Sequence, residues 1–255
     1  MHIEELRQTL AGQSFHPLFA TLSGAHLYGF ESPDSDVDLR GAFVLSLDQV
    51  VGLHEPRETI SKTFDESGLE IDLVCHDVHK FCRLLNKNSG EILEQLFSEL
   101  VVWPSPRLEE LRSLFRPHIG KEFYYHYRGF LLNQLRFIEK PESTVKETLY
   151  GYRVALTGIH LLRSGAMVAH LPSLLEEYHE PGVSDLIAEK RATREHAPLD
   201  EQRRQLHLAR LRQLEQELQK AHQLSRLPCS GGAFEELNQF VVSVRLEGRS
   251  AQCRD

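Results

Sequence analysis

The first third of the chain alternates short apolar segments with polar turns, which is the pattern of a small sheet flanked by helices. Apolar side chains over residues 3–10 recur with helical spacing, and Gly12 follows as a stop. Residues 15–22 are mostly apolar, and residues 37–45 alternate apolar and polar positions before becoming fully apolar, so both segments are expected to be strands. Turn formers occupy residues 25–36, which predicts a tight turn or a short helix between these two strands.

A further strand is expected over residues 69–75, where Glu70 and Asp72 share one face and aliphatic side chains the other. Helical spacing follows over residues 78–85 and 91–97, and a polar turn separates these two segments.

The second half is expected to be mainly helical, because no convincing strand appears between about residue 105 and Phe240. Helical spacing covers residues 123–137 and 145–163, and residues 200–222 predict an amphipathic helix. That helix carries an apolar stripe that suits packing within its own domain better than a coiled-coil partner: Leu211, Leu214, Leu218 and Ala221. Residues 240–244 fit either a last strand or the end of a helix. The predicted fold class is therefore α+β, with a small mixed sheet and flanking helices over residues 1–105 and a mainly α-helical region over residues 106–255.

Composition narrows the class of protein. The 255 residues are 41% hydrophobic and 26% charged, and no run approaches the roughly 18 apolar residues of a membrane span. The acidic, amphipathic residues 1–7 do not resemble a secretory signal, so a cytoplasmic location without membrane attachment is expected. A net charge of −8 argues against broad, sequence-blind wrapping of nucleic acid. The four cysteines include no C-x-x-C pair, so neither a zinc site nor a disulfide framework is favoured.

Three aspartates are the candidate metal ligands. Residues two apart in a strand face the same side, so Asp36 and Asp38 would present both carboxylates to one point, and Asp72 would reach in from a neighbouring strand. Hard oxygen ligands with few protein contacts suit magnesium that is bound together with substrate phosphates. Asp-x-Asp alone is common in turns. A calcium loop does not fit, because Leu39 and Leu45 stand where that loop needs glycine and glutamate.

A glycine upstream of these aspartates suits phosphate binding. Gly24 follows a predicted strand at the start of a short helix, where backbone N–H groups would approach a triphosphate closely. Asp72 would then accept the proton of the attacking hydroxyl, and two metal ions about 3.5–4 Å apart would stabilise the leaving pyrophosphate.

The segment from Ser23 to Gly41 resembles the polymerase-β nucleotidyltransferase superfamily, in particular its bacterial branch of predicted nucleotidyltransferases of the YcgL type. The resemblance is strongest over residues 20–45 and continues more weakly to about residue 165. It implies that Asp36, Asp38 and Asp72 are catalytic and bind Mg²⁺ or Mn²⁺, and that the chain uses an NTP such as ATP. The helical region would then complete the substrate cleft. The nucleotide-binding residues that the resemblance implies are Ser23, Gly24, Ala25, His26, Lys80, Asn88, Tyr150 and Arg153.

The chain departs from the superfamily at one position, because Ala25 follows Gly24 where a serine is usual. Losing one neutral hydrogen bond to a phosphate costs about 0.5–1.5 kcal/mol, less than losing a metal ligand. The supporting residues also have plain structural explanations. On these explanations, Lys80 and Arg153 are solvated residues on helix surfaces and His26 forms only a local hydrogen bond. Arg40 then forms a salt bridge with a neighbouring carboxylate.

The predicted function is transfer of a nucleoside monophosphate to an acceptor hydroxyl on an RNA 3′ end, a protein or a small molecule. A basic stretch tips the expectation slightly to RNA, although acidic residues are interleaved with it: Lys190, Arg191, Arg194, Arg203 and Arg204. The alternative is a non-catalytic nucleotide-binding or regulatory module of a toxin–antitoxin-like pair, which Ala25 favours and the three aspartates disfavour. The sequence carries no signature of an oligomeric state.

Overall fold

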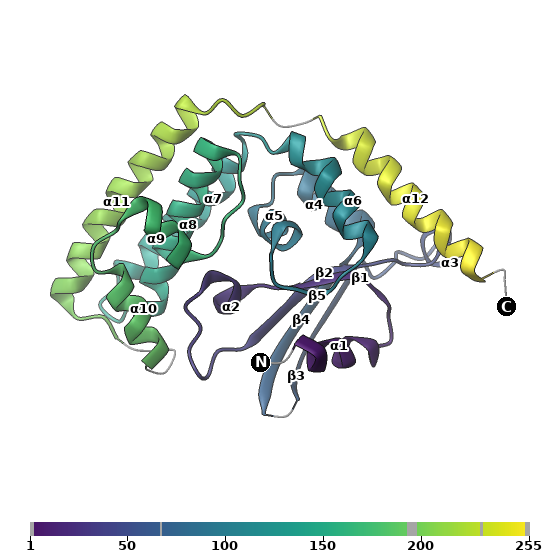
Figure 1. Ribbon diagram of the computed structural model, residues 1–255, viewed down its shortest axis with the longest axis horizontal. Coiled ribbons are helices and arrows are strands. Elements are labelled where there is room, and N and C mark those ends of the chain that lie inside the picture. Colours follow the sequence, from purple (N-terminus) through teal and green to yellow (C-terminus); the bar gives the residue numbers. More distant parts are fainter. Residues whose placement is uncertain (1–2, 67, 193–197, 230–231, 253–255) are drawn as a thin grey trace. The chain divides into compact units, whose positions relative to one another are not determined.

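The computed structural model describes residues 3–66, 68–192, 198–229 and 232–252 (Figure 1). The chain forms two compact units. The sheet unit comprises residues 1–23, 37–118 and 231–255, and the helical unit comprises residues 24–36 and 119–230. This division differs from the single boundary expected near residue 105. Helix α6 (Pro106–Phe115) packs against the sheet, and the C-terminal helix α12 (Phe234–Gln252) packs back onto the sheet unit.

The sheet unit is built on a five-stranded mixed sheet with the strand order β3-β4-β2-β1-β5. Strands β2 and β4 run parallel, and the other neighbouring pairs run antiparallel. The strands are β1 (Pro17–Leu22), β2 (Val37–Phe43), β3 (Thr59–Glu66), β4 (Leu69–Asp77) and β5 (Val101–Trp103). The structure thus confirms the predicted α+β class and the predicted strands β1, β2 and β4.

Helices cover both faces of this sheet (Figure 1). They are α1 (Ile3–Ala11), α3 (Leu47–Val51), α4 (Val78–Asn86), α5 (Gly90–Phe97), α6, the 3-10 turn η1 (Arg116–His118) and α12. Helix α1 lies on one face, where Leu6 and Leu10 join the strand side chains in the apolar core. Helices α4, α5 and α6 lie on the other face, where the rings of Phe19 and Phe81 meet edge to face at 5.2 Å.

The core depends on the two-residue period of the strands. In β2 and β4 the alternate residues Val37, Leu39, Ile71 and Leu73 are buried on the α1 face. Their sequence neighbours point to the opposite face, which is the face that carries the polar side chains described below. Gly41 allows β1 and β2 to approach, because a Cβ atom there would lie 2.2 Å from the backbone oxygen of Phe19.

The helical unit consists of α2 (Gly24–Tyr28), α7 (Phe123–Ile138), α8 (Val145–Ser164), α9 (Leu171–Tyr178), α10 (Val183–Ala192) and α11 (Glu201–Leu224). The predicted apolar stripe of α11 is buried against α7 and α8, so it packs within its own unit as expected. Helix α8 begins at a capping box formed by Thr144 and Glu147 and ends at Gly165, whose φ of 76° is left-handed.

Several elements differ from the sequence-based expectations or were not predicted. Strand β3 and the short strand β5 were not predicted. Of the two alternatives left open for residues 240–244, the structure has the helix, since these residues lie within α12. Among the described helices, none has the length and apolar character needed to span a bilayer. Arg194 and Cys253 lie outside the described residues.

Candidate active site

Two of the predicted metal-binding carboxylates lie side by side on neighbouring strands. Asp38 in β2 and Asp72 in β4 are direct partners in the parallel register. Residues in register on adjacent strands point to the same face of a sheet. Because the apolar core fills the α1 face, Asp38 and Asp72 both point to the opposite face. Strand period and strand pairing alone therefore bring these two carboxylates together.

Arg40 joins the two carboxylates from the same face. Its Nη2 donates to Asp38 Oδ1 at 2.6 Å and to Asp72 Oδ2 at 2.8 Å. Its Nη1 donates to the backbone oxygen of Asp72 at 2.6 Å. The salt bridge that the sequence offered as the plain explanation of Arg40 is confirmed. In addition, one guanidinium neutralises two adjacent like charges, which sequence reasoning had not predicted.

This donor set fits a divalent cation. Two carboxylate oxygens that accept hydrogen bonds from one nitrogen surround a common point, and a positive charge already lies at that point. The side chains of Asp38 and Asp72 are 25% and 34% exposed, so a ligand can reach them. Hard carboxylate oxygens suit Mg²⁺ or Mn²⁺. Asp36 is exposed and precedes β2, and its part in such a site stays a prediction.

Further along β4, His76 lies on the same face as Asp72. Its Nδ1 is 3.0 Å from Thr59 Oγ1. Burial and, to a smaller extent, the positive charges of Lys80 and Arg40 lower the pKa of His76 from 6.5 to about 4, although Glu58 acts in the opposite direction. The imidazole is therefore neutral at physiological pH.

Lys80 and Asn88 have clear structural roles. Lys80 Nζ donates to Thr59 Oγ1 at 2.6 Å, beside His76, which is four residues beyond Asp72 along β4. At about 3.3 Å per residue, this contact lies about 13 Å along the strand from Asp72. Asn88 adopts a left-handed φ of 59° just after α4, which ends that helix and turns the chain into α5. A nucleotide-binding role for either residue stays a prediction.

The segment that follows β1 belongs to the helical unit, whereas it was expected within the catalytic domain over residues 1–105. Ser23 still lies in the sheet unit, where its N–H donates to the backbone oxygen of Asp38 at 2.9 Å. Gly24 then turns the chain with a left-handed φ of 60°, which explains the glycine on backbone grounds. Ala25 and His26 follow in the short helix α2. The predicted contacts of these four residues with a nucleotide stay predictions.

Aromatic packing holds this segment within the helical unit. The ring of Tyr150 meets those of Tyr28 and Phe30 edge to face, at 5.7 and 5.4 Å. The guanidinium of Arg153 lies 4.0 Å from the ring centroid of Tyr28, and only 3% of Arg153 is exposed. Arg153 is therefore a buried cation–π partner rather than the solvated helix residue of the plain explanation. Binding of a nucleotide by Tyr150 or Arg153 stays a prediction.

Helix α10 adds polar contacts to the same segment. Lys190 Nζ donates to Ser32 Oγ at 3.1 Å, and Arg191 Nη2 donates to the backbone oxygen of Gly29 at 2.9 Å. Lys190 is 1% exposed. Arg203 and Arg204 form ion pairs with Glu189 and Glu201. The predicted basic stretch is therefore largely committed to internal contacts over its described residues.

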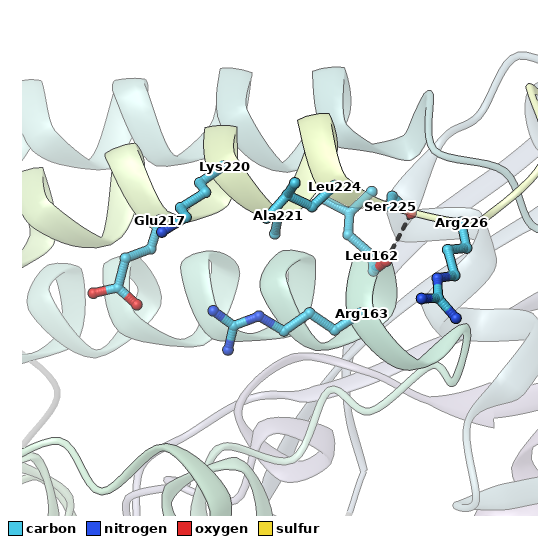
Figure 2. Close-up of a pocket in the computed structure, with 8 residues that line it drawn as sticks. All are labelled: Leu162, Arg163, Glu217, Lys220, Ala221, Leu224, Ser225 and Arg226. Carbon is cyan, nitrogen blue, oxygen red and sulfur yellow. Dashed lines mark hydrogen bonds between the residues drawn. The ribbon is translucent and has the colours of Figure 1, made fainter.

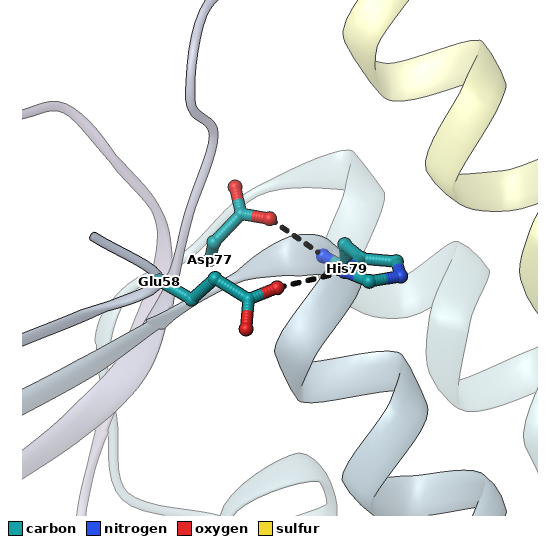
Figure 3. Close-up of side chains that lie close together, drawn as sticks. All are labelled: Glu58, Asp77 and His79. Atoms are coloured by element: carbon teal, nitrogen blue, oxygen red, sulfur yellow. Dashed lines mark hydrogen bonds and ion pairs between the residues drawn. The ribbon is translucent and has the colours of Figure 1, made fainter. Parts of the chain in front are cut away.

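A second cluster, in the sheet unit, also has the spacing of a metal site. Glu58, Asp77 and His79 bring one ligand atom each within 4.8 Å of one another (Figure 3). However, the fully buried Asp77 already accepts the backbone N–H groups of His79 and Leu45, each at 3.0 Å, and pairs with Arg245 at 2.5 Å.

The carboxylate of Glu58 in this cluster is occupied as well. It pairs with His79 at 2.9 Å and with Arg83 at 3.1 Å. Burial raises the pKa of Glu58, but the hydrogen bond from His79 and the charges of Arg83 and Lys80 outweigh this effect and lower it. Both oxygens of the fully buried Asp77 are thus occupied, in contrast to the partly exposed Asp38 and Asp72. The cluster serves as the N-cap of α4 and an ion-pair network.

Comparisons with known proteins agree on one family. Residues 1–243 match the family described as the RNA repair pathway DNA polymerase beta family. An uncharacterized protein from Methanocaldococcus jannaschii is 32% identical over 178 residues, which cover 67% of this chain and 71% of that protein. The uncharacterized protein YcgL from Bacillus subtilis is 26% identical over 160 residues, which cover 60% of this chain and 59% of YcgL.

A solved structure matches as well. It is the crystal structure of a nucleotidyltransferase-like protein from Exiguobacterium sibiricum 255-15, with 15% identity and a TM-score of 0.29. The match covers 84% of this chain and 73% of that chain.

Proposed function

We propose that this chain transfers a nucleoside monophosphate from an NTP to an acceptor hydroxyl, because it belongs to the RNA repair pathway DNA polymerase beta family. In this reaction the hydroxyl oxygen forms a bond to the α-phosphorus, the bond from the α-phosphorus to the bridging oxygen breaks, and pyrophosphate leaves. The observation that carries the proposal is the pair of in-register aspartates, Asp38 and Asp72, whose carboxylates share one nitrogen of Arg40.

Asp38 and Asp72, with Asp36 as the expected third ligand, would hold the cation. A divalent cation such as Mg²⁺ or Mn²⁺ bound there would neutralise phosphate charge and favour deprotonation of the attacking hydroxyl. Asp72 would accept the proton of that hydroxyl. Arg40 orients both carboxylates before the substrate arrives, because it binds Asp38 and Asp72 at the same time.

We further propose that the acceptor is an RNA end. The description of the family as one of an RNA repair pathway supports RNA over a protein or a small molecule.

The test is an incubation of the purified chain with each NTP labelled at the α-phosphate, with Mg²⁺ or Mn²⁺ and with pooled RNA that carries free 3′ hydroxyls. Label transfer to RNA and release of pyrophosphate are the readouts. Asp38→Asn and Asp72→Asn should each lower transfer by about 10²–10⁴-fold, the range for a positioned acid–base group. The matched control is Glu70→Gln, which removes an exposed carboxylate from the same strand and face as Asp72 and should retain activity.

The alternative is a nucleotide-binding or regulatory module without catalysis, and Ala25 in place of the usual serine favours it. In that case the wild-type chain would bind an NTP yet produce neither labelled acceptor nor pyrophosphate under any of these conditions. Equal activity of the wild type and Asp38→Asn would also contradict the proposed active site.

A further inference from the structure

A hollow of about 500 Å³ lies where the C-terminal ends of α8 and α11 meet in the helical unit (Figure 2). Arg163 lines it from the last turn of α8, Lys220 and Leu224 line it from the last turns of α11, and Arg226 follows α11. In Figure 2, Arg226 and Glu217 lie at opposite ends of this hollow, with Arg163 between them.

The hollow carries an excess of positive charge. Three of its side chains are cationic, and its single acidic side chain, Glu217, is already paired with Arg210 at 2.9 Å. Arg210 also forms a bidentate ion pair with the buried Glu180. The negative charge of Glu217 is therefore partly offset before any ligand arrives.

The three cations of the hollow differ from the other arginines of α11. Arg203, Arg204, Arg210 and Arg212 each form an ion pair with a carboxylate. Within the described part of the chain, Arg163, Lys220 and Arg226 form no ion pair. All three are exposed. These three side chains therefore form a cluster of exposed positive charge without ion pairs at this hollow.

The side chain of Arg163 is partly ordered by an aromatic contact. Its guanidinium lies 5.6 Å from the ring centroid of Tyr178. Arg163 also forms a side-chain hydrogen bond with Tyr178, and its remaining N–H groups can donate to a phosphate. The helix macrodipole favours positive charge near each helix C-terminus separately, at about 0.3–1 kcal/mol. It does not account for three such charges without ion pairs around the same hollow.

We infer that this hollow binds the phosphate backbone of the RNA acceptor. The inference rests on the proposed function for the identity of the acceptor. Three cations match the charge of consecutive phosphates. The exposed side chain of Leu224, which also lines the hollow, offers an apolar surface to a sugar or base.

The test measures binding of a fluorescein-labelled single-stranded RNA by anisotropy in EDTA, without NTP, over a series of salt concentrations. Lys220→Gln/Arg226→Gln should weaken binding by about tenfold or more at low salt, and adding Arg163→Gln should weaken it further. Each lost phosphate contact on a single strand lowers the slope of log K against log salt by about 0.7, so the triple variant should lose a slope of about 2.

The matched control is Arg203→Gln/Arg212→Gln, which removes two positive charges from α11 that are already ion-paired. Its salt slope should equal that of the wild type. Melting temperatures establish that both variants are folded. An unchanged affinity and slope for the triple variant would overturn the inference, and so would equal losses in the control. Displacement of the RNA from the hollow by millimolar free triphosphate, with loss of triphosphate binding in the variants, would assign the hollow to a nucleotide instead and also overturn it.

The two proposals fail separately. Asp38→Asn should bind RNA like the wild type, because binding here needs no transfer. If the wild type transfers label to RNA while the triple variant binds RNA normally, the inference fails and the proposed function stands. If no transfer occurs with any acceptor but the triple variant loses RNA binding, the proposed function fails and the hollow stands as an RNA-binding site.

Discussion

Arg40 takes the place of a cation between two carboxylates that lie directly opposite each other on parallel strands. Like charges in such positions repel, so their coexistence requires a positive partner. A guanidinium and a divalent ion both meet this requirement. The stability of the sheet unit should therefore depend on which cation is available.

This relation predicts a metal-dependent rescue. Arg40→Gln should melt at a lower temperature than the wild type in EDTA, because it loses charge-assisted hydrogen bonds of about 1.5–3 kcal/mol each before allowance for partial exposure. Mn²⁺ should then raise its melting temperature more than that of the wild type, because a bound ion adds about 2.7 kcal/mol to the free energy of unfolding at one hundred times the Kd. Arg83→Gln, which loses its ion pair with Glu58, is the control. Equal Mn²⁺ shifts in Arg40→Gln and the wild type would contradict a metal site at Asp38 and Asp72.

His76 predicts a pH dependence of stability. Its pKa is lowered from 6.5 to about 4 in the folded chain, so the unfolded chain binds the proton more readily. This contribution to folding is fully present above about pH 6.5 and is lost progressively as the pH falls towards 4. When the pH is lowered from 7.5 to 4.5, the free energy of unfolding of His76→Gln should therefore fall less than that of the wild type. Urea unfolding at both pH values measures this difference. The control is His16→Gln, which removes an exposed histidine and should follow the wild type. Parallel curves for His76→Gln and the wild type would refute this role.

At the residue scale, the sequence predicted the positions of Asp38 and Asp72 because strand period alone sets the face of each side chain. It could not predict that Arg40 bridges them, since that contact depends on the register between β2 and β4. It also placed Gly24 with the sheet. The contacts of Tyr28 with Tyr150 and Arg153, more than a hundred residues away, put the segment after Gly24 with the helices.

At the scale of elements, two glycines in helix interiors have opposite surroundings. A Cβ atom at Gly158 in α8 would lie 2.8 Å from Tyr127 Cβ and 2.9 Å from Leu218 Cδ1, so this glycine lets α7, α8 and α11 pack closely. At Gly129 in α7, a Cβ atom would meet nothing within 4 Å.

Alanine at these two positions should therefore change stability in opposite directions. Gly129→Ala should stabilise the chain by about 0.5–1 kcal/mol through helix propensity. Gly158→Ala should destabilise it, because overpacking costs about 1–3 kcal/mol and outweighs the same gain. Thermal melting followed by circular dichroism at 222 nm measures both variants. A Gly158→Ala variant as stable as Gly129→Ala would mean that the three helices tolerate wider spacing.

The elements that the sequence missed have a common physical cause. Strand β3 is largely exposed, and no apolar alternation marks it, because its place is set by pairing with β4 along its whole length. Strand β5 has only three residues, too few for a period to be visible. The long amphipathic helices, in contrast, were predicted to within a few residues, because several turns of helical spacing define them.

At the scale of the whole molecule, the C-terminal helix completes the unit in which the N-terminal strands lie. Helix α12 packs against α4 and α6, and Arg245 pairs with the fully buried Asp77 at 2.5 Å. Arg245 also donates to the backbone oxygen of Leu45 at 2.9 Å. One side chain near the end of the chain thus fixes the end of β4 and the segment after β2.

Arg245→Gln should accordingly be strongly destabilising, by about 3–5 kcal/mol, because it leaves the charge of Asp77 buried and unpaired. Arg212→Gln removes an arginine from an exposed ion pair with Glu139 and should cost about 0–1 kcal/mol. Urea unfolding of the two variants side by side gives the comparison. If Arg245→Gln proved as mild as Arg212→Gln, α12 would be dispensable for the sheet unit.

The helical unit interrupts the sheet unit in sequence, since residues 119–230 lie between α6 with its following turn and α12. During translation, the strands of the sheet unit are therefore synthesised long before α12, which packs on that unit. The helical unit, in contrast, is complete before α12 is synthesised. We expect the nascent chain to acquire its paired Asp38 and Asp72 in a stable setting only after α12 has been synthesised. A chain that stops before α12 would thus have a complete helical unit and an unsupported sheet.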